Sequence, residues 1–246
     1  ISLIKGSAII LSKYLLARKI SNLMEIEDKK RLSAEKAYAI IEPDLNRDSV
    51  LGIGTGSTTN YFIEILNNKK IDIKGAICSS QVSKENLKDS GIDLLELNEV
   101  HEIDYYIDGA DEFNDRNELI KGGGGALTRE KILANSSKKF ICIVDDTKYT
   151  KVLGSFPLPI EVIKLARSAI SREIMKMGGR PVLRNNFVTD NGNQIIDVHN
   201  LDIKVPYEME QLINNIPGVI ENGIFASRTA DIIIKATDQS VEEIFI

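Results

Sequence analysis

The sequence of 246 residues contains no tryptophan, only two cysteines and only two histidines. Cys78 and Cys142 each lie within an apolar stretch, which is typical of small hydrophobic side chains on buried strands of a reduced protein. This interpretation is favoured over a catalytic or metal-binding thiol. His101 and His199 are isolated and show no zinc-type spacing to each other or to a cysteine. Acid–base chemistry in this protein must therefore depend mainly on carboxylates and lysine.

The charge also lacks a strong excess of either sign. The chain has 31 basic and 36 acidic residues, and no basic stripe stands out, so composition gives little support to nucleic-acid binding. An apolar content of 43% with 27% charged residues is typical of a globular enzyme that can bury a core. We expect a cytoplasmic protein with neither nucleic-acid nor membrane partners.

The first 23 residues carry four basic side chains and no acidic one. Lys5 and Lys13 interrupt their apolar stretches, which leaves no run of the roughly 18 residues that a membrane span requires. One interpretation is an amphipathic targeting segment. We favour an N-terminal extension ahead of a natural start at Met24, because acidic residues follow Met24 at once.

The order of the expected elements predicts an α/β fold. Apolar strand patterns alternate with helical patterns, which favours a mostly parallel sheet with helices on both faces and ligands at the carboxyl ends of the strands. The strands are expected at residues 49–53, 73–78, 93–96, 104–107 and 139–144, and the helices at residues 28–41, 58–66, 82–89 and 128–134.

The pattern changes near residue 156, where the sequence FPLP interrupts the strand rhythm. A strand, a helix, two strands around an Asp-Asn-Gly-Asn turn, a second helix and a last strand then predict a small α+β domain of the split βαβ, ferredoxin-like type. Residues 230–236 and 241–246 are expected to return to the main sheet. The expected parts are an N-terminal extension (1–23), a main catalytic domain (24–155 and 232–246) and a small domain (156–231). Within the small domain the expected elements are strands 160–163 and 219–221 and helices 166–177 and 207–214.

A glycine-rich turn with the sequence GIGTGSTT follows the first expected strand and opens a helix. Its backbone N–H groups and the hydroxyls of Ser57 and Thr58 can surround an anion, for which phosphate is the natural ligand. A dinucleotide fingerprint would have a glycine at residue 57, and Asp72 precedes the next strand instead of ending it. Phosphate binding is therefore the stronger interpretation.

Acidic residues follow another expected strand directly, in the sequence DGADE at residues 108–112. Asp108 and Asp111, three apart on a turn, can face one pocket at the ligand-binding edge of the sheet. An Asx-turn or a solvated loop is the alternative. A metal site is less favoured, because no histidine and few further oxygen ligands accompany the three acids.

Lys121 precedes four consecutive glycines, which allow backbone to approach a ligand closely. Glu130 follows in the first turn of a helix that we expect Thr128 to cap. Taken alone, Glu130 is better explained as a carboxylate that complements the helix dipole. Together with Lys121, it can supply the base and the cation that proton transfer next to a carbonyl requires.

Four of these segments, in this order, resemble ribose-5-phosphate isomerase type A: GIGTGSTT, DGADE, KGGGGALTREK and FPLPIEV. The resemblance extends from about residue 28 to the C-terminus and includes VTDNGNQIIDVH and IPGVIENGIFA. It implies a Rossmann-like α/β domain with a smaller α+β domain. It also implies interconversion of ribose 5-phosphate and ribulose 5-phosphate without metal or cofactor, in the pentose phosphate pathway, by a homodimer or homotetramer.

The resemblance implies a role for each matched residue. Glu130 would move a proton between C2 and C1 through an enediolate, Lys121 would stabilise charge on the sugar oxygens, and Asp108 and Asp111 would hold the sugar hydroxyls and assist ring opening. Lys29 is an alternative to Lys30, because the spacing to the glycine turn is longer than in the family. The substrate-binding residues it implies are Gly54, Thr55, Gly56, Ser57, Thr58, Lys30, Gly122, Gly123 and Gly124.

Gly125 is a departure from the resemblance, since alanine is more often expected there. Two other functions compete with the isomerase. A related sugar-phosphate deaminase or lactonase would recruit a histidine near the acidic motif, and His101 lies seven residues before it. A sugar-phosphate-binding sensor domain would keep the phosphate loop without catalysis, yet Glu130 and Lys121 are both present.

Overall fold

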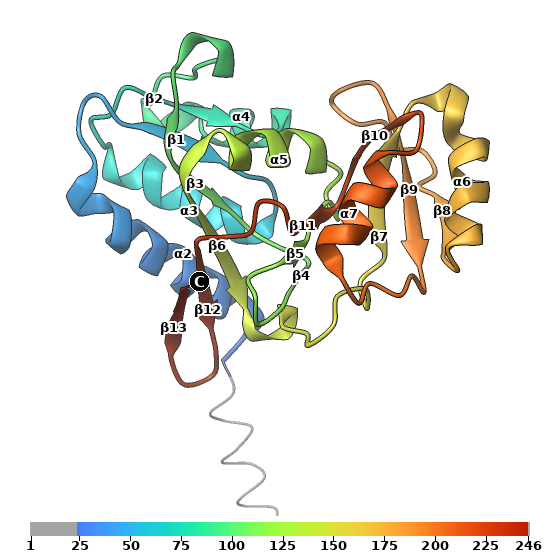
Figure 1. The fold of residues 1–246 in the computed structure, drawn as a ribbon. Coiled ribbons are helices and arrows are strands. Elements are labelled where there is room, and N and C mark those ends of the chain that lie inside the picture. The colour runs from blue at the N-terminus through green and yellow to red at the C-terminus, as the bar shows by residue number, and fades with distance from the viewer. Residues whose placement is uncertain (1–23, 246) are drawn as a thin grey trace, which may run out of the picture.

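The computed structural model describes residues 24–245 (Figure 1). The extension expected at residues 1–23 lies outside the described residues, so the structure tests neither interpretation of it. The described chain forms a six-stranded sheet, a separate four-stranded sheet and a three-stranded sheet. No helix within residues 24–245 combines the length and the apolar character that a membrane crossing requires.

The six-stranded sheet has the strand order β13-β12-β6-β3-β1-β2. All neighbouring strands are parallel except β12 and β13, which form an antiparallel hairpin. This arrangement confirms the mostly parallel sheet and the return of the C-terminal segments to it. Its strands are β1 (Val50–Ile53), β2 (Gly75–Cys78), β3 (Ile103–Asp108), β6 (Ser137–Asp145), β12 (Ile232–Ala236) and β13 (Val241–Phe245).

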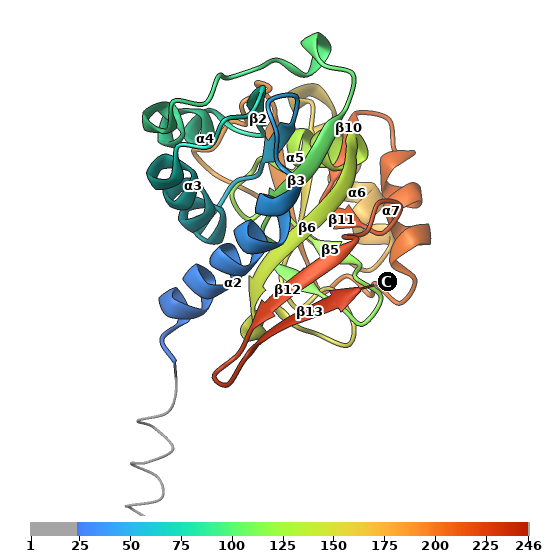
Figure 2. The same ribbon diagram turned by 90° about the vertical axis from the view of Figure 1, so that its left-hand side faces the viewer.

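Alternating side chains of these strands enter two different cores. Leu51, Ile53 and Ile107 pack with helices α2 (Ile26–Ile41) and α3 (Ser57–Lys69) on one face. Tyr106 and Phe140 point to the opposite face, where helix α5 (Leu127–Asn135) lies. Figure 2 shows α2 and α3 on one side of the sheet and α5 on the other. Because successive strand residues face opposite ways, a sheet with apolar residues in succession is covered on both faces.

The four-stranded sheet has the order β10-β7-β9-β8, with every neighbouring pair antiparallel. Two strand–helix–strand units interleave to give this order, which confirms the expected split βαβ arrangement. We call this sheet and its two helices the small domain. Its elements are β7 (Leu158–Val162), α6 (Arg167–Lys176), β8 (Arg180–Leu183), β9 (Gln194–His199), α7 (Pro206–Asn214) and β10 (Val219–Asn222).

A three-stranded sheet lies between the two larger sheets and was not predicted from the sequence. It pairs β4 (Glu112–Phe113), β5 (Leu119–Ile120) and β11 (Ile224–Phe225) in antiparallel fashion. Each strand has only two residues, which is too short for alternation to be recognised. In Figure 1 this sheet and α5 lie where the main and small domains meet.

Several local predictions were wrong. The strand expected at residues 93–96 is reduced to one bridge between Ala76 and Leu94, and its two end residues, Asp93 and Glu96, are charged and exposed. Thr128 does not cap α5, whose N-cap is Ala126 and has no side-chain hydrogen bond. Pro159 lies inside β7 instead of ending the strand rhythm, and its carbonyl accepts a hydrogen bond from the N–H of Gly223.

The helix expected at residues 82–89 is divided into α4 (Gln81–Asn86) and a short 3-10 helix. The helix expected at residues 166–177 likewise begins with a 3-10 turn. The connection between β8 and β9 is also longer than the tight hairpin that the Asp-Asn-Gly-Asn turn suggested, because β8 already ends at Leu183. The 3-10 helices are η1 (Glu42–Asp44), η2 (Lys88–Ser90), η3 (Leu97–Glu99), η4 (Asp146–Lys148) and η5 (Lys164–Ala166).

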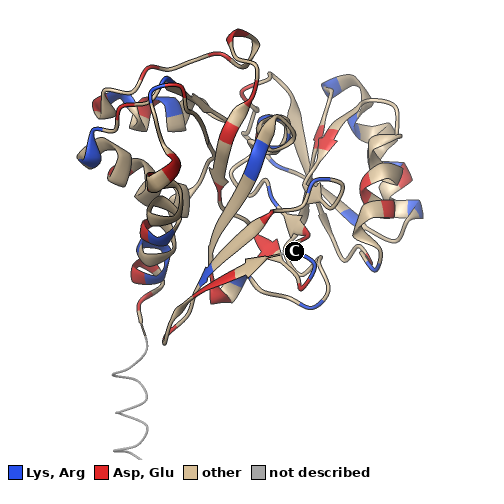
Figure 3. Cartoon of the chain, turned by 60° about the vertical axis from the view of Figure 1, so that its left-hand side comes forward, with Lys and Arg blue, Asp and Glu red and all other residues tan. Residues whose placement is uncertain are grey.

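Acidic and basic side chains are mixed on the surface. In the view of Figure 3, both signs alternate along α2, and the small domain also carries both. The distribution of charged residues along the chain in this view therefore agrees with the similar numbers of acidic and basic residues in the sequence.

Candidate active site

A cavity of about 130 Å³ opens at the carboxyl ends of β1 and β3. This is the edge of a parallel sheet where ligands ordinarily bind, and the space suits a small polar molecule better than a dinucleotide. Most of the predicted site residues meet here although they come from four separate segments. The cavity is lined by Lys30, Thr55, Gly56, Ser57, Thr58, Thr59, Gly109, Ala110, Asp111, Lys121, Gly122, Gly123, Gly124, Glu130 and Lys148.

The glycine-rich turn forms one end of the cavity. Gly56 has a φ of +127° and stands at the N-cap of α3, where no side chain caps the helix. The first bond of the helix runs from the N–H of Asn60 to the carbonyl of Gly56 at 3.0 Å, so the preceding N–H groups have no partner within the helix. Free N–H groups at a helix N-terminus form a binding site for an anion such as phosphate.

The structure distinguishes the two candidate lysines of α2. Lys30 lines the cavity. Lys29 is buried and its Nζ lies 2.9 Å from Oδ1 of Asp146 and 2.7 Å from Oδ1 of Asp238, outside the lining. The first of these contacts joins α2 to the short helix that carries Lys148. Lys30 is therefore the lysine of α2 that faces the anion-binding end.

Lys148 is a lining residue that the sequence reasoning missed. It lies in η4, immediately after the carboxyl end of β6. That position was the available signal, because side chains that follow parallel strands gather at one edge of the sheet. Lys148 brings a third lysine to the lining, in addition to Lys30 and Lys121. Thr59, Gly109 and Ala110 were also not predicted.

Lys121 also lines the cavity and is only 2% exposed. Its Nζ is 2.7 Å from Oδ2 of Asp108, 2.5 Å from the carbonyl oxygen of Gly109 and 3.3 Å from Oε2 of Glu130. Burial opposes the charge of this lysine, but the two carboxylates outweigh burial and raise the pKa of Lys121. The side chain is therefore held as an ammonium ion inside the protein.

Glu130 reaches the cavity from the first turn of α5 and is 3% exposed. Burial raises the pKa of Glu130 to about 8, although the ammonium of Lys121 acts in the opposite direction. Its Oε2 is buried and accepts no hydrogen bond despite the nearby charge of Lys121. A carboxylate with an unoccupied oxygen and a raised pKa is suited to accept a proton from a ligand in the cavity.

Asp108 is fully buried and is not among the residues that line the cavity. Besides Lys121, it accepts hydrogen bonds from the backbone N–H groups of Thr55 at 3.0 Å and Gly109 at 2.7 Å, and from the hydroxyl of Tyr106. The structure therefore places Asp108 behind Lys121, as the acid that holds this lysine and the phosphate loop together.

Gly54 also lies outside the lining. A Cβ atom at this position would be 1.9 Å from Cγ of Asp108. Gly54 is thus needed because the carboxylate of Asp108 packs directly on its backbone.

Asp111 lines the cavity, and burial raises its pKa. The backbone N–H of Gly123 donates a hydrogen bond to Oδ2 of Asp111 at 2.7 Å. A Cβ at residue 123 would be 2.6 Å from Oδ1 of Asp111, so the glycine allows this close approach. The acidic turn and the glycine segment therefore form one wall of the cavity.

Glu112, the third acid of the turn, points elsewhere. It is 5% exposed and accepts hydrogen bonds from the backbone N–H groups of Gly154 at 2.7 Å and Phe156 at 2.5 Å. Its role is to hold the segment that leads into the small domain. Within residues 24–245, histidine, cysteine and acidic side chains do not form a group of three or more that could hold a metal ion.

The arrangement combines two chemical capacities in one cavity. One end presents helix N–H groups, hydroxyls and two lysines to an anion. The same cavity also presents a carboxylate base 3.3 Å from an ammonium group. A base and a cation in this relation can remove a proton next to a carbonyl and stabilise the oxyanion that results.

Comparisons with known proteins agree with this geometry. A family model described as Ribose 5-phosphate isomerase A (phosphoriboisomerase A) matches residues 75–239. The crystal structure of ribose 5 phosphate isomerase A from Neisseria gonorrhoeae is 47% identical, with a TM-score of 0.87 over 91% of this chain and 98% of that chain.

Two further solved structures are similar over nearly the same range. A D-ribose-5-phosphate isomerase in complex with phospho-erythronic acid is 40% identical, with a TM-score of 0.85 over 91% of this chain and 100% of its own. Ribose 5-phosphate isomerase A from Methanocaldococcus jannaschii is 37% identical, with a TM-score of 0.83 over 90% of this chain and 100% of its own.

Proposed function

The chain belongs to the ribose 5-phosphate isomerase A family, and from this premise we propose how its residues carry out the reaction. The protein is an aldose–ketose isomerase that interconverts D-ribose 5-phosphate and D-ribulose 5-phosphate in the pentose phosphate pathway. The observation that supports our residue assignment is the pair formed by Glu130 and Lys121, which line the same cavity as the phosphate loop.

The phosphate group is held by the N-terminus of α3. Backbone N–H groups of Gly56 and Ser57, the hydroxyl of Thr58 and the ammonium groups of Lys30 and Lys148 surround this end of the cavity. The negative charge of the phosphate is complemented by both the helix dipole and the two lysines. Anchoring the phosphate fixes the direction in which the carbon chain of the sugar extends.

The proton transfer takes place at Glu130. In the aldose-to-ketose direction, its carboxylate removes the proton from C2 of the open-chain aldose, and the electrons of the C–H bond move toward the C1 carbonyl. The ammonium of Lys121 stabilises the negative charge that develops on the enediolate oxygens. A proton then passes from the C2 hydroxyl to the oxygen on C1, and the carboxylic acid of Glu130 returns its proton to carbon C1, which leaves a carbonyl at C2 and a hydroxyl at C1.

The two aspartates have different tasks in this proposal. Asp111 lines the cavity and has a raised pKa, so it is positioned to hold a sugar hydroxyl and to assist ring opening. Asp108 keeps Lys121 charged and oriented through its 2.7 Å contact with Nζ. The glycines at residues 122–124 allow the sugar to approach the backbone. A related isomerase was solved in complex with phospho-erythronic acid, a phosphorylated sugar acid, which supports a phosphorylated sugar as the ligand of this chain.

We also propose a division of the chain into a catalytic domain of residues 24–155 and 232–246 and a small domain of residues 156–231. The separate cores of the two larger sheets support this division. The family relationship supports a homodimer or homotetramer. A cytoplasmic location is supported by the free, buried thiols of Cys78 and Cys142.

A turnover assay tests the assignment of the base. We expect the purified protein to convert ribose 5-phosphate to ribulose 5-phosphate in the presence of a metal chelator. Glu130→Gln keeps the size of the side chain but removes the base, so we expect turnover to fall by about 100-fold or more. Appearance of ribulose 5-phosphate is measured under steady-state conditions, and circular dichroism confirms that the variant is folded.

Glu173→Gln is the matched control, because Glu173 is an exposed acid of α6 far from the cavity lining. We expect this variant to turn over at the wild-type rate. Wild-type turnover in folded Glu130→Gln would show that another group is the base. A chain without any isomerase activity would instead support the sugar-phosphate-binding sensor interpretation.

A further inference from the structure

The helix that carries Glu130 is held on both sides of this residue by the small domain. Helix α5 follows the glycine segment of the main domain. Three of the four residues from Thr128 to Lys131 nevertheless form hydrogen bonds with residues beyond residue 158. Glu130 is the fourth and faces the cavity. The contacts on its two neighbours therefore determine where the carboxylate lies.

Lys131 makes the most extensive of these contacts. It is 6% exposed, and its Nζ donates to Oε1 of Glu210 at 2.8 Å and to Oε1 of Glu221 at 2.9 Å. It also lies 2.8 Å from the carbonyl oxygen of Asn222 and 2.7 Å from that of Ile224. These acceptors come from α7, β10 and β11, so a single buried ammonium group joins α5 to three elements.

Phe225 connects this group to the catalytic pair. Nζ of Lys131 lies 4.9 Å from the centre of its ring, and Nζ of Lys121 lies 5.5 Å from the same centre. A cation within about 6 Å of an aromatic ring is attracted to it. The two lysines that flank the site of Glu130, one in the cavity and one behind α5, are thus fixed against one side chain of β11.

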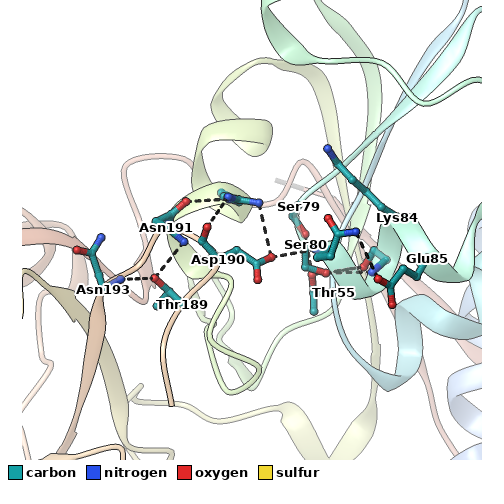
Figure 4. Close-up of polar contacts among 12 residues, drawn as sticks. Thr55, Ser79, Ser80, Lys84, Glu85, Thr189, Asp190, Asn191 and Asn193 are labelled. Carbon is teal, nitrogen blue, oxygen red and sulfur yellow. Dashed lines mark hydrogen bonds and ion pairs between the residues drawn. The ribbon is translucent and has the colours of Figure 1, made fainter. Parts of the chain in front are cut away.

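Arg129 makes a second group of contacts on the other side of the helix. Its Nε donates to Oδ1 of Asn191 at 2.8 Å, and its Nη2 donates to the carbonyl oxygen of Asp190 at 2.8 Å. Oδ2 of Asp190 also accepts the backbone N–H of Gln81 at 2.9 Å, at the start of α4. Figure 4 shows Asp190 between Asn191 on one side and Ser79, Ser80 and Thr55 of the main domain on the other.

Glu161 holds the base of this loop and α5 together. Its carboxylate is fully buried in β7 and accepts hydrogen bonds from Thr189 at 2.7 Å, from Asn193 at 2.9 Å and from the hydroxyl of Thr128. The same acid therefore fixes both the loop that binds Arg129 and the first turn of α5. This is why Thr128 serves as a contact to the small domain and not as a helix cap.

Helix α5 has few restraints of its own. It is nine residues long, its N-cap Ala126 makes no side-chain hydrogen bond, and it follows four glycines. A short helix without a cap, attached to a flexible segment, is weakly positioned by its local chain. The contacts of Thr128, Arg129 and Lys131 supply the restraint that the preceding segment cannot.

We propose that the small domain is the clamp that positions the base, with Arg129 and Lys131 as positioning residues for Glu130. The inference rests on the proposed role of Glu130. The clamp holds the Glu130 carboxylate 3.3 Å from the ammonium of Lys121. The hydrogen bonds of Arg129 and Lys131 involve neither the N-terminus of α3 nor the lysines Lys30 and Lys148, to which we assign the phosphate. Loss of the clamp therefore lowers kcat and leaves substrate binding intact.

The decisive variants are Arg129→Ala and Asp190→Ala. The side chains of Arg129 and Asp190 are 35% and 40% exposed, so their removal is compatible with folding. We expect kcat to fall by about 10- to 100-fold, the loss that a misplacement of roughly 1 Å produces. KM for ribose 5-phosphate should stay within about two-fold of the wild-type value. Lys131→Met should lower kcat in the same way if the variant folds.

A pH profile gives a readout that a loss of stability alone would not change. The ammonium of Lys121 lowers the pKa of Glu130. Displacement of the carboxylate from Lys121 should therefore move the acidic limb of kcat/KM to higher pH in Arg129→Ala and Asp190→Ala. Arg129→Lys keeps one donor of the guanidinium and is expected to recover part of the lost turnover.

Lys84→Met is the matched control. Lys84 lies in α4, close to the N–H that binds Asp190, but its ion pair is with Glu96 at 2.8 Å and involves neither α5 nor the small domain. We expect this variant to keep the wild-type kcat and pH profile. A comparable loss of kcat in Lys84→Met would show that general damage to the domain boundary, not the clamp, explains the effect.

Glu130→Gln measured in parallel separates the two proposals. Wild-type turnover in Glu130→Gln overturns the assignment of the base and the clamp that depends on it. Loss of turnover in Glu130→Gln, with kcat and pH profile unchanged in both Arg129→Ala and Asp190→Ala, overturns the clamp alone. An increase in KM at constant kcat in these two variants also overturns it, because it would assign the loop to substrate binding.

Discussion

The protonation of Lys121 and Glu130 depends on burial and on the charge of the other residue. Burial favours the neutral form of each side chain, whereas each charge favours the charged form of the other. For Lys121 the two nearby carboxylates are stronger than burial, and its pKa is raised. For Glu130 burial is stronger, and its pKa is raised to about 8 from an ordinary value of 4.5. The pair therefore holds a permanent cation beside a base that titrates near neutral pH.

This difference predicts the pH dependence of the reaction. Glu130 can accept the C2 proton only as a carboxylate, so kcat/KM should fall as the pH decreases below about 8, where the free enzyme takes up a proton at this site. Initial rates measured between about pH 6 and about pH 10 test this expectation. A profile that stays flat down to about pH 5 would mean that the base has an ordinary carboxyl pKa.

At the scale of the element, the glycine segment is shaped by different requirements at each position. Gly123 accommodates Asp111, and Gly122 has a φ of +105°. Gly125 has a φ of +83°, and a Cβ there would lie 2.2 Å from Cζ of Phe187. The glycine at residue 125, where alanine was expected more often, is therefore matched to an aromatic ring contributed by the loop after β8.

Gly125→Ala is predicted to destabilise the fold through two separable effects. The left-handed backbone costs about 1–2 kcal/mol for an alanine, and the overlap with Phe187 adds to this cost. In a Phe187→Ala background only the backbone cost remains, so Gly125→Ala should reduce the free energy of unfolding by less. Urea unfolding of the four proteins of this double-mutant cycle measures the difference.

Gly178→Ala is the control for the backbone effect alone, because Gly178 has a φ of +90° and no atom lies within 4 Å of its Cβ position. Its cost should equal that of Gly125→Ala in the Phe187→Ala background. Equal costs of Gly125→Ala in both backgrounds would show that Phe187 moves aside freely.

Helices and strands were predictable from the sequence where a single segment carries a long apolar pattern. The strands β1, β3 and β6 and the helices α2 and α3 show clear apolar patterns, and the structure confirms them. The three two-residue strands and the 3-10 turns were not predictable, because elements of two or three residues are too short to show a pattern. In addition, β11 is distant in sequence from its partner β5. The expected strand at residues 93–96 was wrong because a single bridge to Ala76 forms at this edge of the sheet.

At the scale of the whole molecule, the three-stranded sheet joins two hydrophobic cores. Phe113, Leu119 and Phe225 enter the core of the main sheet, whereas Ile120 and Ile224 enter the core of the small domain. Successive residues of the same short strands therefore support different domains. Separating the domains would expose both sets of side chains and the buried ammonium of Lys131.

We therefore predict that the protein unfolds in a single cooperative transition. Hydrogen exchange measured in urea should show that the amides of Ile141 in β6 and of Ile196 in β9 lose protection together. Far-UV circular dichroism should give the same midpoint as these amides. An earlier loss of protection confined to β7, β8, β9 and β10 would show instead that the small domain unfolds independently.

The chemistry of the site was largely determined by the sequence alone. The phosphate loop, the acidic turn, Lys121 and Glu130 all lie within short segments whose order and residue types indicate a sugar-phosphate site, and the structure brings these segments to one cavity. Such motifs are readable because their function depends on neighbouring residues, for example free N–H groups at the start of a helix.

Only the tertiary structure decided which side chains reach the cavity and what holds them there. It placed Lys30 and Lys148 in the lining, buried Lys29 against two acids and put Asp108 behind Lys121. It also surrounded the helix of Glu130 with contacts from the small domain. These outcomes depend on burial and on charges contributed by residues far apart in the chain, and no local pattern in the sequence records such distances.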